Sequence, residues 1–160
     1  MDTIKLTETQ KQLIERVGVF YEHSGIQPAP SRVIGLLLVS DKTELTFDQI
    51  CSALKISKSA ASNAINLLLT TGKIDYVTFS GDRKRYFRSR VSNWKEETQK
   101  GLKSILGMNE LLKEVLNQRP KSTKDFNASL EEIIAFMEFL HDEVDTIFQK
   151  WETRKEKLMA

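Results

Sequence analysis

The feature that most constrains this chain lies between residues 57 and 90, where a short helix of small polar residues precedes a β-hairpin with a basic tip. Residues 57–71 place apolar side chains at helical spacing on one face and Ser and Asn on the other. Residues 74–79 and 85–89 are rich in the β-branched and aromatic types that favour strands. The Ser-Gly-Asp-Arg-Lys between them predicts the hairpin loop.

A second helix precedes this pair of elements. Thr46 begins it with a capping box, because Gln49 lies three residues on and their side chains and backbone N–H groups can bond reciprocally. The short turn Lys55-Ile56 then leads to Ser57, a good N-cap for the next helix. Two helices joined by a tight turn and followed by a hairpin predict a winged helix-turn-helix.

Further helices flank this region. Residues 4–24 form an amphipathic pattern, and the loop at residues 25–30 contains two prolines that disfavour helix. A helix is predicted from about Ser31, and its apolar run indicates a central element covered on several sides. After Val91 the pattern is helical again, with a break at Arg119-Pro120 and another helix from about Ser122.

The last helix carries an apolar stripe over three heptads, which is too long to be covered by a small winged domain. It packs on the preceding helix, on a second subunit, or on both, and we expect both. An intramolecular helical hairpin is the alternative. The residues predicted to dimerise are Leu13, Val17 and Phe20 of the first helix and Leu130, Ile133, Met137, Leu140, Val144, Ile147 and Trp151 of the last.

Charge is concentrated where the hairpin lies. Residues 55–90 contain eight basic and two acidic groups, a net charge of +6 in a chain whose total is +2. Short hydrogen-bonding side chains suit base edges, and Lys and Arg suit phosphates, so duplex DNA is the predicted partner. The candidate DNA-binding residues are Ser57, Lys58, Ser59, Ser62, Asn63, Asn66, Arg83, Lys84, Arg85 and Arg88.

Other functional classes find little support in the sequence. The single cysteine, Cys51, and two histidines show no metal-ligand spacing, and no nucleophile–base pair or phosphate-binding glycine loop is evident. We therefore expect no enzyme activity, no cofactor and no metal site. With no secretory signal and no membrane-length apolar run, we expect a cytoplasmic protein without a membrane partner.

The expected fold class is mainly α with a small β-hairpin wing. At 160 residues, the chain is predicted to be one regulator domain. Residues 1–30 provide an N-terminal helix in the dimer interface, residues 31–90 the winged helix-turn-helix, and residues 91–160 a helical dimerisation region.

Residues 10–90 resemble the MarR-type winged-helix regulators, and among them the GbsR-like branch. The motifs that carry this resemblance are Gly25 to Gly35, Leu45-Thr46 with Ile50, Ser57-Lys58-Ser59 with Ser62, and Gly81-Asp82-Arg83-Lys84 with Tyr86 and Phe87. The resemblance implies a homodimeric transcriptional repressor. Its recognition helix enters the major groove, its wing contacts the backbone or minor groove, and its half-sites lie about 34–36 Å apart.

Two questions stay open at the level of sequence. Some relatives sense a small-molecule effector, but no residue set here identifies such a site. A winged helix can also serve as a protein-interaction module without specific DNA binding. The net charge of +6 on residues 55–90 favours DNA binding over this alternative.

Overall fold

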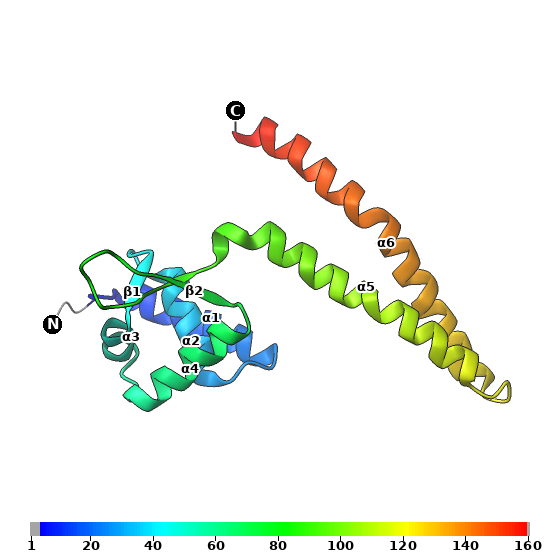
Figure 1. Cartoon of the computed structure of the whole chain (residues 1–160), viewed down its shortest axis with the longest axis horizontal. Coiled ribbons are helices and arrows are strands. Elements are labelled where there is room, and N and C mark those ends of the chain that lie inside the picture. Colours follow the sequence, from blue (N-terminus) through cyan, green and yellow to red (C-terminus); the bar gives the residue numbers. More distant parts are fainter. Residues whose placement is uncertain (1–3, 160) are drawn as a thin grey trace. The chain divides into compact units, whose positions relative to one another are not determined.

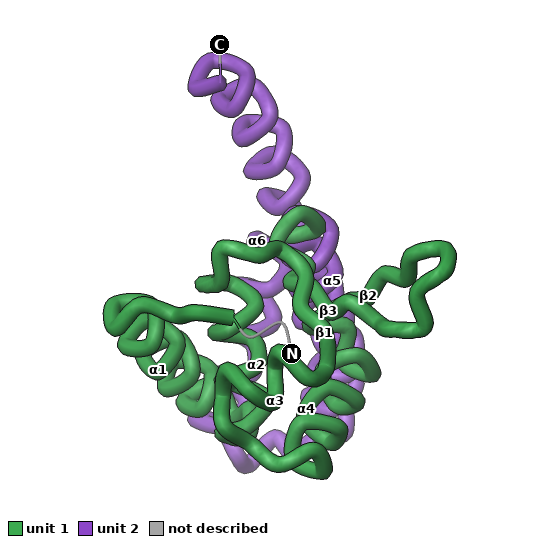
Figure 2. Tube along the Cα trace, turned by 90° about the vertical axis from the view of Figure 1, so that its left-hand side faces the viewer, with its two compact units in different colours: residues 1–94 green, residues 95–160 purple. Residues whose placement is uncertain are grey.

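The computed structural model describes residues 4–159 and divides the chain into two compact units (Figures 1 and 2). The first, here called the winged-helix unit, extends to Trp94, and the second, the helical hairpin, begins at Lys95. The elements of the first unit are α1 (Glu8–His23), α2 (Pro28–Val39), β1 (Glu44–Thr46), α3 (Phe47–Leu54), α4 (Lys58–Thr70), β2 (Ile74–Val77), β3 (Tyr86–Ser89) and the single 3-10 turn η1 (Val91–Asn93).

Helix α1 starts later than the sequence pattern predicts. A capping box fixes its first turn: the Thr7 backbone N–H donates to Gln10 Oε1 at 2.9 Å, and the Gln10 N–H donates to Thr7 Oγ1 at 3.1 Å. The cap residue has an extended backbone, so residues 4–6 lie outside the helix. The predicted helix over residues 4–24 is thereby shortened to Glu8–His23.

Helix α2 starts earlier than predicted, at Pro28 instead of Ser31. Proline fits the first turn of a helix because its missing N–H would have no intrahelical partner there, so Pro28 and Pro30 begin the helix instead of preceding it. The helix is buried nearly all round, as expected. At Gly35 a Cβ atom would lie 2.9 Å from the carbonyl oxygen of Ile14, so α1 and α2 approach too closely for any larger residue.

The sheet has three antiparallel strands in the order β1-β3-β2, and only the β2–β3 hairpin was predicted. Strand β1 pairs Leu45 with Phe87, and β2 pairs Tyr76 with the same Phe87. The hairpin strands are also shorter than predicted, which leaves residues 78–85 as the wing loop. The predicted fold class, mainly helical with a small β wing, is confirmed.

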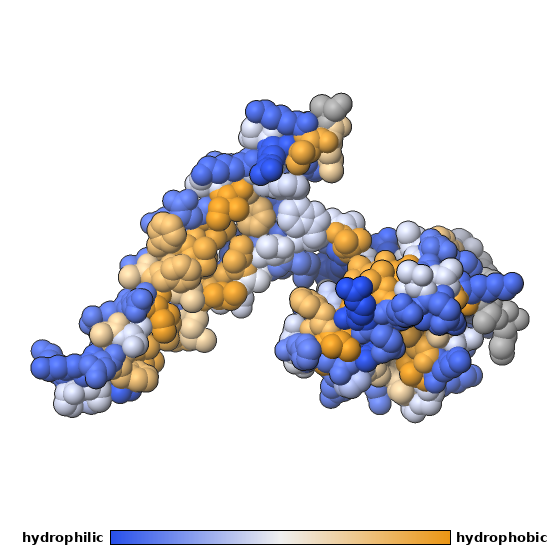
Figure 3. All heavy atoms as spheres, turned by 180° about the vertical axis from the view of Figure 1, so that it is seen from behind, coloured by the Kyte–Doolittle hydropathy of each residue, from blue (hydrophilic) through white to orange (hydrophobic). Residues whose placement is uncertain are grey.

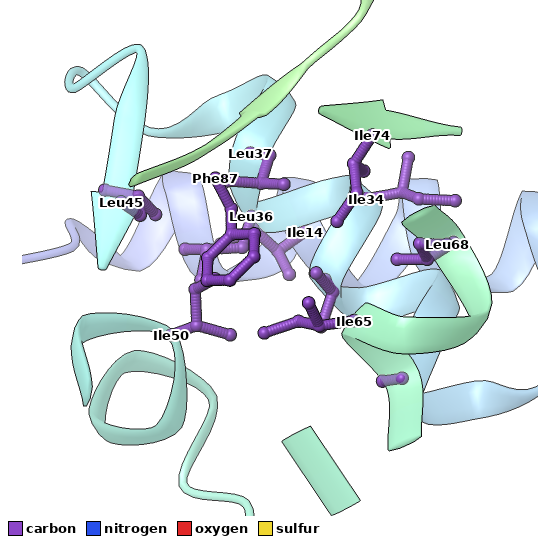
Figure 4. Packing of buried hydrophobic residues seen from close by; sticks show 12 residues of the cluster. Ile14, Ile34, Leu36, Leu37, Leu45, Ile50, Ile65, Leu68, Ile74 and Phe87 are labelled. Atoms are coloured by element: carbon purple, nitrogen blue, oxygen red, sulfur yellow. The ribbon is translucent and has the colours of Figure 1, made fainter. Parts of the chain in front are cut away.

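One apolar core joins these elements (Figure 4). Leu36 from α2, Leu45 from β1 and Ile50 from α3 are almost fully buried. Each side chain of this size contributes about 1.5–3 kcal/mol when buried. Ile65 and Leu68 bring α4 onto the same core, and it therefore fixes α4 relative to the sheet that carries the wing.

The second unit consists of α5 (Trp94–Gln118) and α6 (Lys124–Met159), with α5 beginning at the last residue of the first unit. Between them lies the predicted break, where Asn127 Nδ2 donates to the Pro120 carbonyl at 3.2 Å. Two ion pairs join the helices, Lys113–Glu138 and Lys95–Glu152. The C-terminal region therefore includes an antiparallel helical hairpin.

The apolar stripe predicted on the last helix divides into two adjacent stripes. Leu130 and Val144 are buried in the hairpin, together with Ile134 and Phe148, which the strict heptad did not include. Ile133 and Ile147, by contrast, stay exposed. Apolar side chains gather along one face of the hairpin (Figure 3). The exposed ones on α5 and α6 include Ile105, Met108, Leu111, Val115, Ile133, Phe136 and Ile147.

Residues 4–159 contain neither a membrane-spanning helix nor a cluster of metal-binding side chains. No helix in this range is both long enough and apolar enough to cross a bilayer. No group of three or more His, Cys, Asp or Glu side chains in the same range is placed to hold a metal ion.

Candidate nucleic-acid interface

Helix α4 begins at the N-cap predicted from sequence. The Ala60 N–H donates to Ser57 Oγ at 3.1 Å, and the Ser57 and Ser59 hydroxyl oxygens lie 3.0 Å apart. These contacts satisfy one of the free N–H groups of the first turn and tie the two hydroxyl groups together. Ser57 therefore has a structural role in addition to the predicted contact with DNA.

The two faces of α4 separate as the sequence predicts. Its inner face is buried in the core through Ala61, Ala64, Ile65 and Leu68. Ser59, Asn63 and Asn66 are exposed on the outer face, and Ser62 is half-buried at its edge. Lys58, also exposed, is the one charged residue of the helix, so the outer face offers mainly hydroxyl and amide groups. Such groups suit hydrogen bonding to base edges.

The wing loop is held by a hydrogen-bond network around Asp82. Its carboxylate accepts from the Tyr86 hydroxyl at 2.7 Å and from the Lys84 N–H at 2.9 Å. These two bonds, the Tyr86 bond first, lower the pKa of Asp82 below its ordinary value. The loop turns at Gly81, where φ is +82°, a conformation that favours glycine. Arg83 and Lys84 are both exposed beside this turn.

Aromatic rings support the base of the wing. The Arg85 guanidinium lies over the Tyr76 ring, 4.9 Å from its centroid. The Phe79 and Tyr86 rings meet edge to face at 5.0 Å. These contacts restrict the hairpin while Arg85 stays exposed, so its charge is oriented before any partner binds.

Arg88 differs from the other candidate cations. It pairs across the strands with Asp75 at 3.2 Å, and it lies within β3 instead of the loop. The pKa of Asp75 is lowered, first by the Tyr76 N–H that its carboxylate accepts and then by Arg88. The candidate cations of the hairpin therefore form an outer group of Arg83, Lys84 and Arg85, and an inner residue, Arg88, that is already paired.

A hollow of about 280 Å³ lies between α4 and the hairpin. Ser62 and Asn66 line it from α4, and Lys84 and Arg85 line it from the hairpin. The first turn of α3 also contributes to it through Asp48, a residue that the sequence reasoning did not include. The remaining candidates, Ser57, Lys58, Ser59, Asn63, Arg83 and Arg88, lie outside this lining. The fold thus brings hydrogen-bonding and cationic side chains from distant parts of the sequence to one surface.

Comparison with known proteins places this surface in a recognised fold. A sequence model of the MarR family matches residues 24–85, which cover α2 through the wing loop. The fold is that of a MarR-type winged helix. The crystal structure of a transcriptional regulator superposes with a TM-score of 0.64 at 20% identity, covering 89% of this chain and 99% of that one.

Two further proteins are similar to this chain. The transcriptional regulator MmpR5 of Mycobacterium tuberculosis is 22% identical over 130 residues, which are 79% of each chain. The S. aureus MepR–DNA complex is 18% identical, with a TM-score of 0.42 over 81% of this chain and 92% of that one. The superposition with a TM-score of 0.64, at 20% identity, establishes the fold alone.

The residues predicted to dimerise fall into two groups. Leu13, Phe20, Ile133 and Ile147 are exposed in the single chain, and Phe20 keeps 67% of its surface. The others are buried or half-buried within their own unit: Val17, Leu130, Met137, Leu140, Val144 and Trp151. The residues predicted to dimerise include none from α5, on which Ile105, Met108, Leu111 and Val115 are exposed.

Proposed function

We propose that the protein is a double-stranded DNA-binding transcriptional regulator. The observation that carries this proposal is the surface on which Ser62 and Asn66 of α4 and Lys84 and Arg85 of the hairpin border one hollow. A helix with hydroxyl and amide groups on its outer face fits the major groove, and a basic loop beside it fits the flanking phosphates. The match of residues 24–85 to the MarR family supports the same assignment.

The two parts of this surface have different roles in the proposal. The outer face of α4, with Asn63 and Asn66, selects sequence, because bidentate amide contacts to bases discriminate by about 1–3 kcal/mol. Arg83, Lys84 and Arg85 supply affinity, because each phosphate contact releases condensed counterions. Arg88 contributes less than these three, since it is paired with Asp75.

The regulator acts as a homodimer. Its exposed apolar face on the hairpin, with Ile105, Met108, Ile133 and Phe136 among its members, is the kind of surface that a second copy would cover. Leu13 and Phe20 of α1 are further exposed apolar residues that a second copy would bury. A symmetric dimer presents two recognition helices to half-sites about 34–36 Å apart.

Two finer assignments rest on the family resemblance: the regulator is a GbsR-like repressor, and it responds to a small-molecule effector. It acts in the cytoplasm, in keeping with its single cysteine. A reporter gene placed behind the bound operator tests the repressor role, because deletion of the regulator then raises expression.

Fluorescence anisotropy with genomic DNA fragments, repeated at several salt concentrations, tests the function as a whole. The expected result is tight binding to a few fragments, weak binding to random duplex, and a steep fall in affinity as salt rises. Light scattering at the same protein concentration should give twice the mass of the 18.4 kDa chain. Equal, weak binding to every fragment would indicate a protein-interaction module instead.

A further inference from the structure

The hollow between α4 and the hairpin contains one group that attraction to DNA does not explain, the carboxylate of Asp48. Asp48 is exposed in the first turn of α3, and it is the one acidic residue among residues 4–159 that line the hollow. The lining also includes Ser62 and Asn66 of α4 and the cations Lys84 and Arg85. A negative charge therefore lies on the surface that is proposed to face a polyanion.

The charged side chains of the hollow do not neutralise one another. Within residues 4–159, the Asp48 carboxylate accepts no hydrogen bond and forms no ion pair. Over the same range, Lys84 and Arg85 form no ion pair either, and the Arg85 guanidinium lies over the Tyr76 ring. Because no cation of the described chain is paired with it, the Asp48 carboxylate repels any anion that enters the hollow.

A capping box holds Asp48 at this place. The Thr46 N–H donates to Gln49 Oε1 at 2.8 Å, and the Gln49 N–H donates to Thr46 Oγ1 at 3.3 Å, so the backbone is fixed on both sides of Asp48. An acid in the first turn of a helix also interacts favourably with the helix dipole. If that were its whole role, removal of Asp48 would affect stability and would not separate one DNA sequence from another.

Without Asp48, the hollow would have the composition of a phosphate site. Ammonium, guanidinium, hydroxyl and amide groups are the side-chain groups that bind phosphate oxygens, and Lys84, Arg85, Ser62 and Asn66 supply one of each. A volume of about 280 Å³ is large enough to admit a phosphate group. Since every duplex carries the same phosphates, a site of this kind would strengthen binding to random DNA without adding selectivity.

We propose that Asp48 is a specificity-determining residue that keeps backbone phosphates out of this hollow. The inference rests on the proposed DNA-binding function. On cognate DNA, base contacts from α4 fix the duplex so that its phosphates meet the wing cations outside the hollow. On random DNA, no base contact fixes this position, and the backbone is drawn toward the cations of the hollow. Asp48 opposes that movement, so it weakens the wrong complex more than the right one.

Fluorescence anisotropy on Asp48→Asn, which removes the charge and keeps the shape, tests the proposal. Affinity for random duplex should rise about fivefold and its log K versus log salt slope should steepen by about 1, while affinity for cognate DNA should change less than about twofold. Asp48→Glu keeps the charge and should behave as the wild type does. The matched control is Asp125→Asn, which removes an exposed carboxylate from the first turn of α6, outside the hollow. It should leave both affinities within about twofold.

Three other results for Asp48→Asn would overturn the proposal. Equal rises on both DNAs would show a general effect of net charge. Equal falls on both DNAs would leave Asp48 with a helix-stabilising role only. A loss on cognate DNA alone would make its carboxylate a base contact instead of a repulsive group.

Inorganic phosphate tests the hollow without DNA. In Asp48→Asn, phosphate should shift the backbone amide NMR signals of Ser62, Asn66 and Lys84 at a concentration at least about fivefold lower than in the wild type. The same concentration dependence in both proteins would overturn the exclusion of phosphate. If the wild type binds no DNA even at low salt, the proposed function fails, whereas the phosphate titration still decides whether Asp48 excludes anions from the hollow.

Discussion

The winged-helix unit and the helical hairpin differ in how far each satisfies its own apolar surface. In the winged-helix unit, helices and strands from residues 14 to 87 close one core, in which Val33, Leu36 and Ile50 are inaccessible to solvent. In the hairpin, the two helices bury one stripe of apolar side chains between them. A second stripe of Ile, Leu, Met, Val and Phe side chains on the same helices stays exposed. The first unit therefore closes a core of its own, whereas the second leaves an apolar face that the proposed dimer would cover.

The largest expected effect lies in the closed core. Phe87 lies on the central strand of the sheet, and its side chain is buried. Phe87→Ala should therefore lower the free energy of unfolding by about 3–5 kcal/mol. Urea denaturation followed by circular dichroism measures this cost. The matched change Phe136→Ala, on the exposed hairpin face, should leave the stability of the winged-helix unit unchanged. If Phe87→Ala and Phe136→Ala lowered the unfolding free energy of the winged-helix unit by similar amounts, the two units would not differ in the way described.

A smaller effect, about 2–4 kcal/mol in dimer stability, is expected from Phe136→Glu, because a carboxylate would be buried at the apolar interface. Analytical ultracentrifugation should show a shift from dimer to monomer, and cognate DNA affinity should fall with it. The control is Ala135→Glu, which adds the same charge at an exposed position next to Phe136 in the sequence but on another side of α6. The Ala135→Glu protein should stay dimeric. A dimeric Phe136→Glu variant would show that the hairpin face is not the interface.

The smallest effect concerns order within the wing. Tyr86→Phe removes the hydroxyl that donates to Asp82, so the pKa of Asp82 should rise toward its ordinary value while the fold persists. Since the native carboxylate has a lowered pKa, the Tyr86 bond stabilises the wing above the ordinary carboxyl pKa, and this contribution disappears as the pH falls below the native pKa. A carboxyl carbon NMR titration measures the pKa. An unchanged value would mean that Lys84 N–H alone holds the carboxylate.

Local signals in the sequence predicted much of this structure. The Thr46 capping box and the Ser57 N-cap were confirmed, because caps depend on residues only a few positions apart. Strand β1 was missed, because three residues are too few to show alternation and their partners lie 40 to 44 positions later.

The two stripes on α6 show the limit of periodicity. Ile133 and Ile134 are both apolar and lie about 100° apart on a helix, so the sequence pattern alone does not tell which one faces α5. The structure buries Ile134 and exposes Ile133. At the interface, likewise, the composition of α4 and the wing indicated the candidate residues. Only the folded structure shows that Ser62 and Asn66 line the same hollow as Lys84 and Arg85. It also shows that Arg88 is paired with Asp75.

The central claim is that α4 selects sequence while the wing supplies affinity. Anisotropy with cognate and random DNA across salt concentrations, on Asn63→Ala and Arg83→Ala, tests it most directly. Asn63→Ala should lose about 1–3 kcal/mol on cognate DNA alone, with the salt slope unchanged. Arg83→Ala should weaken both DNAs and reduce the slope by about 1. Equal losses on both DNAs for Asn63→Ala, or an unchanged slope for Arg83→Ala, would contradict the account.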